Sequence, residues 1–498
     1  MKMVIPFGQN TPDRPATVSQ TVIANDCLPV VDGFALFRSW ANVASPLTAR
    51  CRGALLSTAV SGTSYIYAGD ATKLYESISD YATVSFTDES KGGGYSTGTN
   101  ESWDFCAFDR NSKVIATNYS DAVQSMTIGA GGSSAFADMI TSTNKPKARH
   151  VGVINNFVVL GNTNDATDGA RPSRIWWSAF GDETDFDPDS ATQCDYEDLS
   201  DGGAVQKIIP GNEYGIVVQR DCIRIMRYIG GAQVFEFSRI TGAPGCQFAE
   251  SVTSYGGLVF YIGDGPRFMM LDGVAPVQIG DERMNSQIPF GVDALGTDAT
   301  FSTLMASYYD PRRQNAWFSM PVYDKNTGLW STTPQKIYIC HVPTRQWTTS
   351  SLGVEKFINF AYTTNKWRPS IFSTSHALQI QGLAHRTATV RTGIMSAQEG
   401  GRWQINSIRP LFEGSEFSMV ANCQIGIASS DLPWGGVNQT IGTINSMGMV
   451  NIRKSGVYHQ ITCSISACVT ASSSGSGYPP RAYTVMGLEI EYEREGER

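Results

Sequence analysis

The sequence has 498 residues and a net charge of −8, and charged residues occupy only 17% of its positions. This length exceeds one ordinary hydrophobic core and predicts two or more domains. The 49 glycines and 11% aromatic residues are typical of an ordered, turn-rich β protein and exclude a disordered chain, while the negative charge excludes a globally basic nucleic-acid binder. We therefore expect an all-β protein that does not bind DNA tightly.

The first 50 residues precede any repeated pattern and are rich in Pro, Asp and Thr. We predict that residues 1–50 form an N-terminal arm. Such an arm can supply the strand that closes a ring of repeated units, reach a neighbouring subunit, or form a partly disordered terminus, and the sequence leaves these alternatives open. Residues 1–6 lack the apolar core of a signal peptide, and 18 apolar residues never run together. We therefore expect a chain that folds in a cytosol and has no membrane span.

Residues 204–280 contain one pattern twice, with a separation of 42 residues. An apolar run at 215–218 ends in a polar turn and precedes a second run at 223–228, and the runs at 257–262 and 268–271 repeat this order. Short runs of β-branched and aromatic residues that end at Gly or Asp are typical of β-hairpins. A period near forty residues, with several strands in each unit, is typical of a β-propeller.

The same pair of runs recurs through residues 51–382. The first runs of the pairs are centred on or begin near residues 65, 114, 157, 216, 258, 317 and 371. The resulting spacings of 42 to 59 residues suit four-stranded blades with loop insertions. We therefore predict a β-propeller of about seven blades; ordinary β-hairpins without a radial repeat are the alternative.

The strongest charge run lies within residues 182–201. Asp185, Asp187 and Asp189 alternate as in the opening of a calcium loop, where such carboxylates converge on one cation. However, Ser190 occupies the position that requires Gly, and the final bidentate Glu is missing. We expect a solvated acidic loop between blades, with a calcium site as the alternative.

No other motif predicts chemistry. The five histidines are scattered, and the spacings of zinc sites, nucleophile elbows and phosphate-binding loops are absent. Two short basic clusters, at 145–149 and 312–313, are expected to be solvated surface, with phosphate contact as the alternative. The ten cysteines lie in apolar runs and predict buried free thiols rather than a disulfide framework. We therefore assign no catalytic residue, no cofactor and no metal.

Two units near the end of the repeats share a strand end, a polar turn and a Trp. These tryptophans are Trp330 and Trp347. A Trp that starts a strand after such a turn is expected to pack between blades, and stacking against carbohydrate is the alternative.

From about residue 383 the period fails and a different domain is expected. Its apolar segments occupy residues 403–408, 417–427, 449–452, 458–465 and 483–492, with turns rich in Gly and Ser between them. Five or six strands in about 115 residues suit a β-sandwich. We therefore predict a C-terminal β-sandwich over 383–498, whose charged tail forms a final edge strand.

Short motifs along the chain also carry a resemblance. Thr-Pro-Asp-Arg-Pro occurs at 11–15 and Ala-Asn-Asp-Cys-Leu-Pro at 24–29, and further motifs lie at 32–34, 68–75, 177–182, 196–199, 455–459 and 486–489. In these motifs the chain resembles the packaged-DNA stabilisation proteins of short-tailed bacteriophages, which are also called tail nozzle or tail hub proteins.

The resemblance implies a structural virion protein and no enzyme. Six propeller-containing copies would surround the tail axis, below the portal and adaptor, as a ring-shaped nozzle that retains packaged DNA and conducts it at genome ejection. Tail fibre or spike proteins and passing double-stranded DNA are the other implied partners, and the implied location is the virion tail, after assembly in the host cytoplasm. Two alternatives remain: a propeller-type tail glycan hydrolase or host-polysaccharide-binding protein, and a cellular propeller that acts as a scaffold.

Overall fold

Most of the described chain forms β-strands. The computed structural model describes the chain apart from residues 18, 81–83, 111, 132–134, 232, 289–301, 325–328, 364–365, 397–400, 414–422, 432–439, 467–483 and 496–498. The named helical elements are the short 3-10 turns η1 (Ser200–Gly202), η2 (Ala249–Ser251) and η3 (Asn285–Gln287). The predicted all-β class is therefore confirmed.

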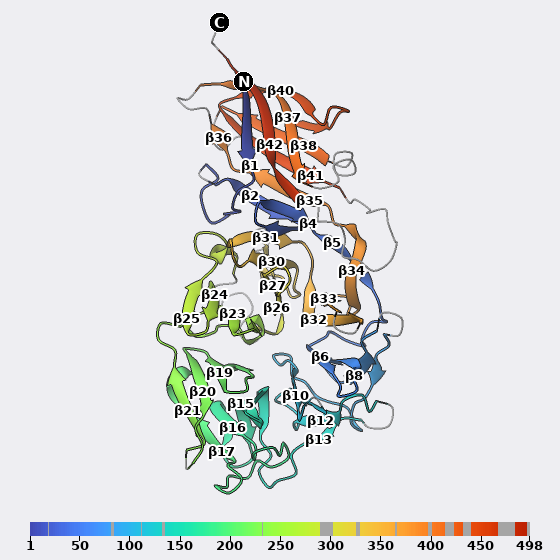
Figure 1. Cartoon of the computed structure of the whole chain (residues 1–498), viewed down its shortest axis with the longest axis vertical. Coiled ribbons are helices and arrows are strands. Elements are labelled where there is room, and N and C mark those ends of the chain that lie inside the picture. The colour runs from blue at the N-terminus through green and yellow to red at the C-terminus, as the bar shows by residue number, and fades with distance from the viewer. Residues whose placement is uncertain are drawn as a thin grey trace.

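Seven antiparallel units of four strands, each called a sheet of the ring below, follow one another around a ring in chain order (Figure 1). Six of them are separate sheets, and the sixth in order is part of a larger sheet of ten strands. The first contains β6 (Gly53–Thr58), β7 (Ser64–Gly69), β8 (Leu74–Ile78) and β9 (Thr87–Asp88). The second contains β10 (Asp104–Phe108), β11 (Lys113–Thr117), β12 (Gln124–Thr127) and β13 (Ala137–Asp138). The third contains β14 (Lys147–Ile154), β15 (Phe157–Asp165), β16 (Gly169–Trp177) and β17 (Asp195–Asp198).

The other four sheets complete the ring. The fourth contains β18 (Val205–Ile209), β19 (Tyr214–Gln219), β20 (Ile223–Tyr228) and β21 (Phe235–Arg239), and the fifth contains β22 (Thr253–Tyr255), β23 (Leu258–Gly263), β24 (Arg267–Asp272) and β25 (Ala275–Gln278). The sixth contains β26 (Ala306–Asp310), β27 (Asn315–Met320), β30 (Lys336–His341) and β31 (Gln346–Ser350), with the hairpin β28 (Tyr323–Asp324) and β29 (Leu329–Trp330) inserted. The seventh contains β32 (Val354–Thr363), β33 (Lys366–Ser373), β34 (Leu378–His385) and β5 (Arg38–Asn42).

The apolar runs predicted from the sequence form the two middle strands of each sheet. The first runs lie in β7, β11, β15, β19, β23, β27 and β33, and the second runs lie in β8, β12, β16, β20, β24, β30 and β34. These strand predictions are confirmed. Middle strands give the strongest signal because sheets pack on both of their faces, so their apolar residues run almost without interruption.

Hydrophobic clusters lie between consecutive sheets all around the ring. Between the second and third sheets, for example, Phe108 packs in one cluster with Leu160 and Trp176. Between the seventh and first sheets, Phe372 packs in one cluster with Ile66. Because the last sheet packs against the first, the ring closes, and this arrangement is compatible with a β-propeller.

The N-terminal segment supplies the fourth strand of the last sheet. β5 pairs antiparallel with β34, with Ala41 opposite Ile380. The Trp40 ring of this strand lies 6.1 Å from the Phe37 ring and 6.5 Å from the Trp317 ring, measured between ring centroids. The sequence left open whether the N-terminal arm closes the ring, reaches a neighbouring subunit or is partly disordered. Residues 38–42 complete the sheet that closes the ring, so for this part of the arm the first alternative holds.

A second module lies at one end of the ring and carries both chain termini (Figure 1). One of its sheets contains β1 (Lys2–Pro6), β3 (Cys27–Val30), β4 (Gly33–Leu36), β37 (Trp403–Glu413), β40 (Val450–Gly456) and β42 (Thr484–Arg494). The other contains β2 (Thr21–Asn25), β35 (Ala388–Thr392), β36 (Met395–Ser396), β38 (Cys423–Ser430), β39 (Thr440–Thr443) and β41 (Tyr458–Ile465). One cluster joins the sheets, in which Ile408 and Leu488 of the first pack with Ile427 and Ile461 of the second.

The prediction that the charged tail forms an edge strand is wrong. β42 pairs with β37 on one side and with β1 and β4 on the other. Gly33 makes this approach possible, because its φ of +146° is unfavourable for other residues and a Cβ there would lie 2.3 Å from the Val485 carbonyl oxygen. Alternating charges are typical of an edge strand, but the strands that cover β42 come from the other end of the chain.

The two modules share backbone hydrogen bonding. β2 pairs with β31 of the ring and with β35 of the second module, so the sixth sheet of the ring continues into a sheet of ten strands. At this junction the Asp26 carboxylate accepts hydrogen bonds from Ser350 Oγ and Arg386 Nε, each at 2.6 Å. β34 itself extends to His385, past the boundary expected at 382.

The nine cysteines in the described part of the chain are buried free thiols. Cys423 and Cys463 are neighbours, with their Sγ atoms 3.4 Å apart, and Cys468 lies outside the described residues. Burial raises the pKa of Cys246 to about 12, which keeps this thiol protonated and unreactive at neutral pH.

We expect ten free thiols in the purified protein. Alkylation under denaturing, non-reducing conditions should add ten labels per chain by intact mass, because the nine described cysteines are free thiols. The same reaction on the folded protein should proceed much more slowly, because burial shields the thiols. A mass that shows only eight labels would contradict the prediction and would indicate one disulfide.

Candidate functional site

The first strands of six ring sheets, and the segment that leads into the first strand of the fifth, border one central cavity of about 340 Å³. Its lining residues come from β6, β10, β14, β18, β26 and β32 and from the segment that leads into β22. Since all seven sheets reach this cavity, it lies at the centre of the ring. Residues more than 300 positions apart in the sequence meet there, for example Leu55 and Phe357.

Charged side chains around this cavity are paired. Lys207 Nζ on β18 lies 2.7 Å from Asp104 Oδ1 on β10, and Lys356 on β32 forms an ion pair with Glu250. His150 Nδ1 on β14 lies 3.4 Å from Asp104 Oδ2. Each carboxylate therefore faces a lysine from a different sheet, and the charges of the four ionised groups cancel.

The buried positions of these groups shift their pKa values. Burial alone would raise the pKa of Asp104, but the positive charge of Lys207 and the contact with His150 outweigh it, so the Asp104 pKa lies well below its usual range. Burial lowers the pKa of His150 despite the contact with Asp104. At neutral pH Asp104 is therefore ionised and His150 is neutral.

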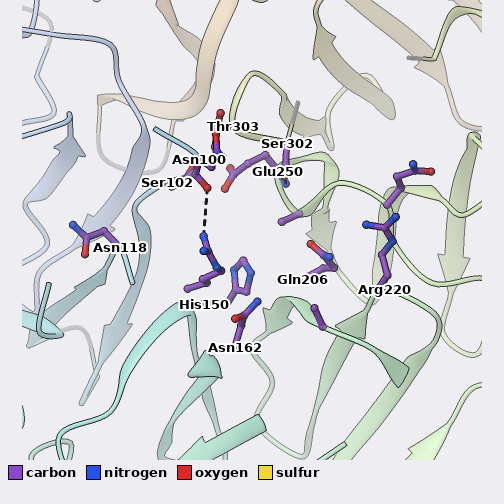
Figure 2. A pocket seen from close by; sticks show the side chains of 14 residues that line it. Asn100, Ser102, Asn118, His150, Asn162, Gln206, Arg220, Glu250, Ser302 and Thr303 are labelled. Atoms are coloured by element: carbon purple, nitrogen blue, oxygen red, sulfur yellow. Dashed lines mark hydrogen bonds between the residues drawn. The ribbon is translucent and has the colours of Figure 1, made fainter. Parts of the chain in front are cut away.

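A second cavity, of about 230 Å³, shares Glu250 with the first. Figure 2 shows polar side chains around it, among them Asn162, Gln206 and Ser302. Two guanidinium groups, of Arg149 and Arg220, also line it. A cavity lined by amides, hydroxyls and arginines suits a polar ligand rather than an apolar one.

The acidic run lies on the outside of the ring. β17 is the fourth strand of its sheet and is exposed throughout. The Asp187 carboxylate accepts hydrogen bonds from the backbone N–H groups of Asn144 and Thr143, at 2.7 and 2.9 Å, and these bonds lower its pKa. The carboxylates of Asp185 and Asp189 accept bonds from backbone N–H groups close to them in the chain.

The carboxylates of Asp185, Asp187 and Asp189 therefore stabilise the local backbone by accepting hydrogen bonds from N–H groups. Within the described residues no group of three or more His, Cys, Asp or Glu side chains is placed to hold a metal ion.

The two basic clusters have different surroundings. Lys147 Nζ donates a hydrogen bond to the Ser120 carbonyl oxygen, at 2.5 Å, whereas Arg149 reaches the smaller central cavity. Arg313 lies 3.3 Å from the Asp310 carboxylate, in the turn between β26 and β27. Of the two basic clusters, only the one at 145–149 therefore contributes a residue to the smaller cavity.

One of the two tryptophans predicted to pack between blades is described by the structure. Trp347 is fully buried, its ring lies 4.6 Å from the Phe268 ring of the preceding sheet, and its Nε1 donates to the Ile279 carbonyl oxygen at 3.0 Å. For Trp347 the packing prediction is confirmed. The side chain of Trp330 lies outside the described part of the structure.

Sequence inspection missed the residues that face the centre of the ring. Asp104, Lys207, Glu250 and Lys356 each lie in or just before the first strand of a sheet. Their shared position in the repeat is the signal that could have identified them. These polar residues interrupt the apolar pattern of the first strands, so the first strands did not stand out in the sequence.

Comparison with known proteins adds little. No protein-family model matches this chain, and no curated protein matches its sequence. Among solved structures, it is similar to a computationally designed protein, Ika8, with 11% identity and a TM-score of 0.36 over 68% of this chain and 99% of that chain. It is also similar to a chain of the Mitotic Checkpoint Complex, with 7% identity and a TM-score of 0.39 over 71% of this chain and 95% of that chain. Likenesses this weak carry no functional argument.

Proposed function

We propose that this protein is a structural component of a phage tail. In this proposal each chain is a seven-bladed β-propeller with a C-terminal β-sandwich, and six copies form a ring-shaped nozzle that retains packaged DNA and conducts it at genome ejection. The partners are the portal and adaptor, tail fibre or spike proteins, and passing double-stranded DNA. The protein acts in the virion tail after assembly in the host cytoplasm and is not an enzyme.

The observation that supports the proposal best is that some of the motifs that resemble the phage family lie next to one another in the structure. The motif at 32–34 contributes Phe34, which pairs with Val485 beside the motif at 486–489. The Phe7 N–H donates to the Met486 carbonyl oxygen at 2.9 Å. Motifs at opposite ends of the sequence therefore lie together in the module that projects from the ring, where they hold the two chain ends side by side.

A second motif also has a structural role. In the motif at 68–75, the buried Asp70 carboxylate accepts hydrogen bonds from the N–H groups of Thr72 and Lys73 and from the Tyr75 hydroxyl, each at 2.8 Å. A carboxylate with these donors fixes the turn between two middle strands. Such use of the motif residues favours a structural protein over a catalytic one.

The alternative of glycan hydrolysis is disfavoured by the charge state of the central cavity. Hydrolysis of a glycoside requires one protonated carboxylic acid beside a second carboxylate. Asp104 and Glu250 border the cavity, but both face lysines and the pKa of Asp104 is low. Since a lysine pairs with each of the two carboxylates and favours its ionised form, neither carboxylate is placed as the protonated acid that this reaction needs.

Electron microscopy of the purified protein tests the assembly directly. Six-fold rings are expected, on the protein alone or after addition of the portal and adaptor that the proposal names as neighbours. Single particles under both conditions would overturn the nozzle proposal and favour a monomeric scaffold. Incubation of the pure protein with host polysaccharide should release no reducing ends, whereas their release would favour the hydrolase.

We also expect weak binding of duplex DNA. The net charge of −8 per chain gives six copies about −48, which repels the DNA polyanion, and a conduit should not grip phosphates that must slide past. A salt titration of DNA binding should show no nanomolar affinity at physiological salt. Tight binding that falls steeply with added salt would show a phosphate-gripping channel and would contradict this prediction.

A further inference from the structure

A third cavity, of about 350 Å³, lies where the ring meets the second module. Its walls come from the arm around Asn10, from β2, from the loop at Met284 that follows the fifth sheet, and from β30, β31 and β35. β2 pairs with β31 on one side and with β35 on the other, so this cavity belongs to the junction of the two modules (Figure 1). None of the described residues that line it lines either central cavity.

Lys336 is the one charged residue among the described residues that line this junction cavity. It is half-buried on β30, and its Nζ lies 5.4 Å from the centre of the Tyr338 ring. In the part of the chain that the structure describes, this ammonium forms no ion pair and no hydrogen bond. Burial lowers the pKa of Lys336, and the negative charge of Asp26 acts against that shift. Asp26 itself pairs with Arg386 at 2.6 Å, so it does not serve as the counter-ion of Lys336.

The carboxylates that are close in the chain to the lining residues also have partners. Asp13 accepts a hydrogen bond from the Ser286 N–H at 3.1 Å, and Glu282 forms an ion pair with Arg14. The charge of Lys336 is therefore not cancelled by these groups. A half-buried ammonium without a counter-ion is destabilising, and a carboxylate that enters the cavity would supply one.

Asn10 adds a second requirement. Its side chain is part of the lining and only 2% of the residue is exposed, yet its Oδ1 has no hydrogen-bond partner in the described protein. A buried polar atom without a partner is destabilising, and a ligand that supplies the missing hydrogen bond recovers this free energy. An amide oxygen only accepts hydrogen bonds. A fitting ligand therefore combines an anion for Lys336 with a donor for Asn10.

The rest of the lining limits the size and kind of the ligand. Pro12, Val22, Ile23 and Met284 give one part of the cavity an apolar wall, which suits an aliphatic group. A water occupies about 30 Å³ of liquid, so the cavity holds roughly a dozen groups of that size. This is the size of one amino acid with a blocked amino group, and far less than a folded partner.

We propose that the junction cavity binds a small carboxylate that carries a hydrogen-bond donor beside the carboxyl group and a branched aliphatic stem. Lys336 pairs with the carboxylate, Asn10 Oδ1 accepts the hydrogen bond from the donor, and the apolar wall contacts the stem. The carboxyl end of a peptide and a free hydroxy acid both have this chemistry. The cavity belongs to a single chain, so its ligand does not depend on the proposed nozzle.

Isothermal titration of the full chain tests the proposal with two acids that share an isobutyl stem. N-acetyl-leucine carries an N–H beside its carboxylate, as the end of a peptide does, and α-hydroxyisocaproate carries a hydroxyl there. At least one acid should bind, and the tighter one distinguishes the two sources. Its affinity should exceed that of N-acetyl-leucinamide, which lacks the charge, by about tenfold or more, because hydrogen bonds between charged groups are the stronger ones.

Isocaproate, which keeps the charge and the stem but has no donor, should bind roughly fivefold more weakly than the tighter acid, the effect of one neutral hydrogen bond. The proposal is overturned if neither acid binds at concentrations up to about 10 mM, or if N-acetyl-leucinamide binds as tightly as the acids. Equal binding of isocaproate and the tighter acid would overturn the role of Asn10. These comparisons use the natural chain and need no variant.

Variants assign the binding to this cavity. Lys336→Met removes the charge, keeps an apolar stem and should weaken the tighter acid by about tenfold or more. Its melting temperature should not fall, because Lys336 has no ion pair to lose. Lys73→Met is the matched control, since Lys73 pairs with Asp88 at 2.7 Å on the first sheet of the ring, and it should bind like the natural chain.

Asn10→Ala should make isocaproate bind as tightly as the donor-bearing acid, because the acceptor that distinguishes them is gone. A general loss of structure would instead weaken all the probes together, and a thermal melt of each variant verifies its fold. Equal affinity of the tighter acid for Lys336→Met and for the natural chain would overturn the assignment to this cavity.

Discussion

Deletion of residues 2–42 is expected to abolish folding of the whole chain. The deletion removes β5 from the seventh sheet, β2 from between β31 and β35, and β1 and β4 from β42. It also removes Phe34 and Phe37, which are completely buried. Loss of one buried Phe side chain costs about 3–5 kcal/mol, and total stability is roughly 5–15 kcal/mol, so the remaining chain has no margin.

Circular dichroism melts and soluble yield measure this effect. The variant should be insoluble or should melt without a cooperative transition. A shorter deletion of residues 2–6 is the control, because β1 is an edge strand whose residues are half-buried or exposed, and this variant should remain folded. A cooperative melt of the 2–42 deletion at the natural midpoint would show that the N-terminal strands do not close the structure.

Substitution of Asp104 by Ala is expected to lower the free energy of unfolding by about 3 kcal/mol. Breaking a buried ion pair costs about 3–5 kcal/mol because the remaining charge is left without its partner. The lower end applies here, since the Lys207 side chain is 25% exposed while Asp104 is 10% exposed. Loss of Asp104 would leave the Lys207 ammonium at the centre of the ring without its partner at 2.7 Å.

The pH dependence of this effect has a definite sign. The pKa of Asp104 is lower in the folded protein than the value of about 3.9 for an unfolded Asp. Its contribution is therefore fully present above about pH 4 and is lost as the pH falls through the folded-state pKa. The difference in stability between the natural chain and Asp104→Asn should be largest near pH 6 and should decrease below pH 4.

Urea unfolding of the variants at several pH values checks both statements. Lys2→Ala is the matched control, because Lys2 and Glu489 form an exposed pair with a distance of 3.1 Å between Nζ and Oε1. Removal of such a surface pair should cost less than about 1 kcal/mol. If Asp104→Ala proved no more destabilising than Lys2→Ala, the paired charges at the centre of the ring would not stabilise the fold.

The sequence by itself determined the all-β class and the middle strands of the ring. Runs such as the one around Val217 are apolar over their whole length because hydrophobic clusters cover both faces of the sheet. The outer strands carry no such pattern: β9 and β13 have two residues each, and β17 is exposed throughout. A strand that is buried on both faces needs apolar residues along its length, which leaves a recognisable pattern in the sequence, whereas an exposed strand needs no such pattern.

Only the tertiary structure decided how the chain ends are paired and what lies at the centre of the ring. β5 joins β34 and β1 joins β42 through backbone hydrogen bonds, which are the same for every side chain and leave no pattern in the sequence. Asp104 and Lys207 lie in different sheets and meet because the ring brings the first strands together. Their pairing depends on the positions of whole sheets, and local sequence carries no information on contacts across that distance.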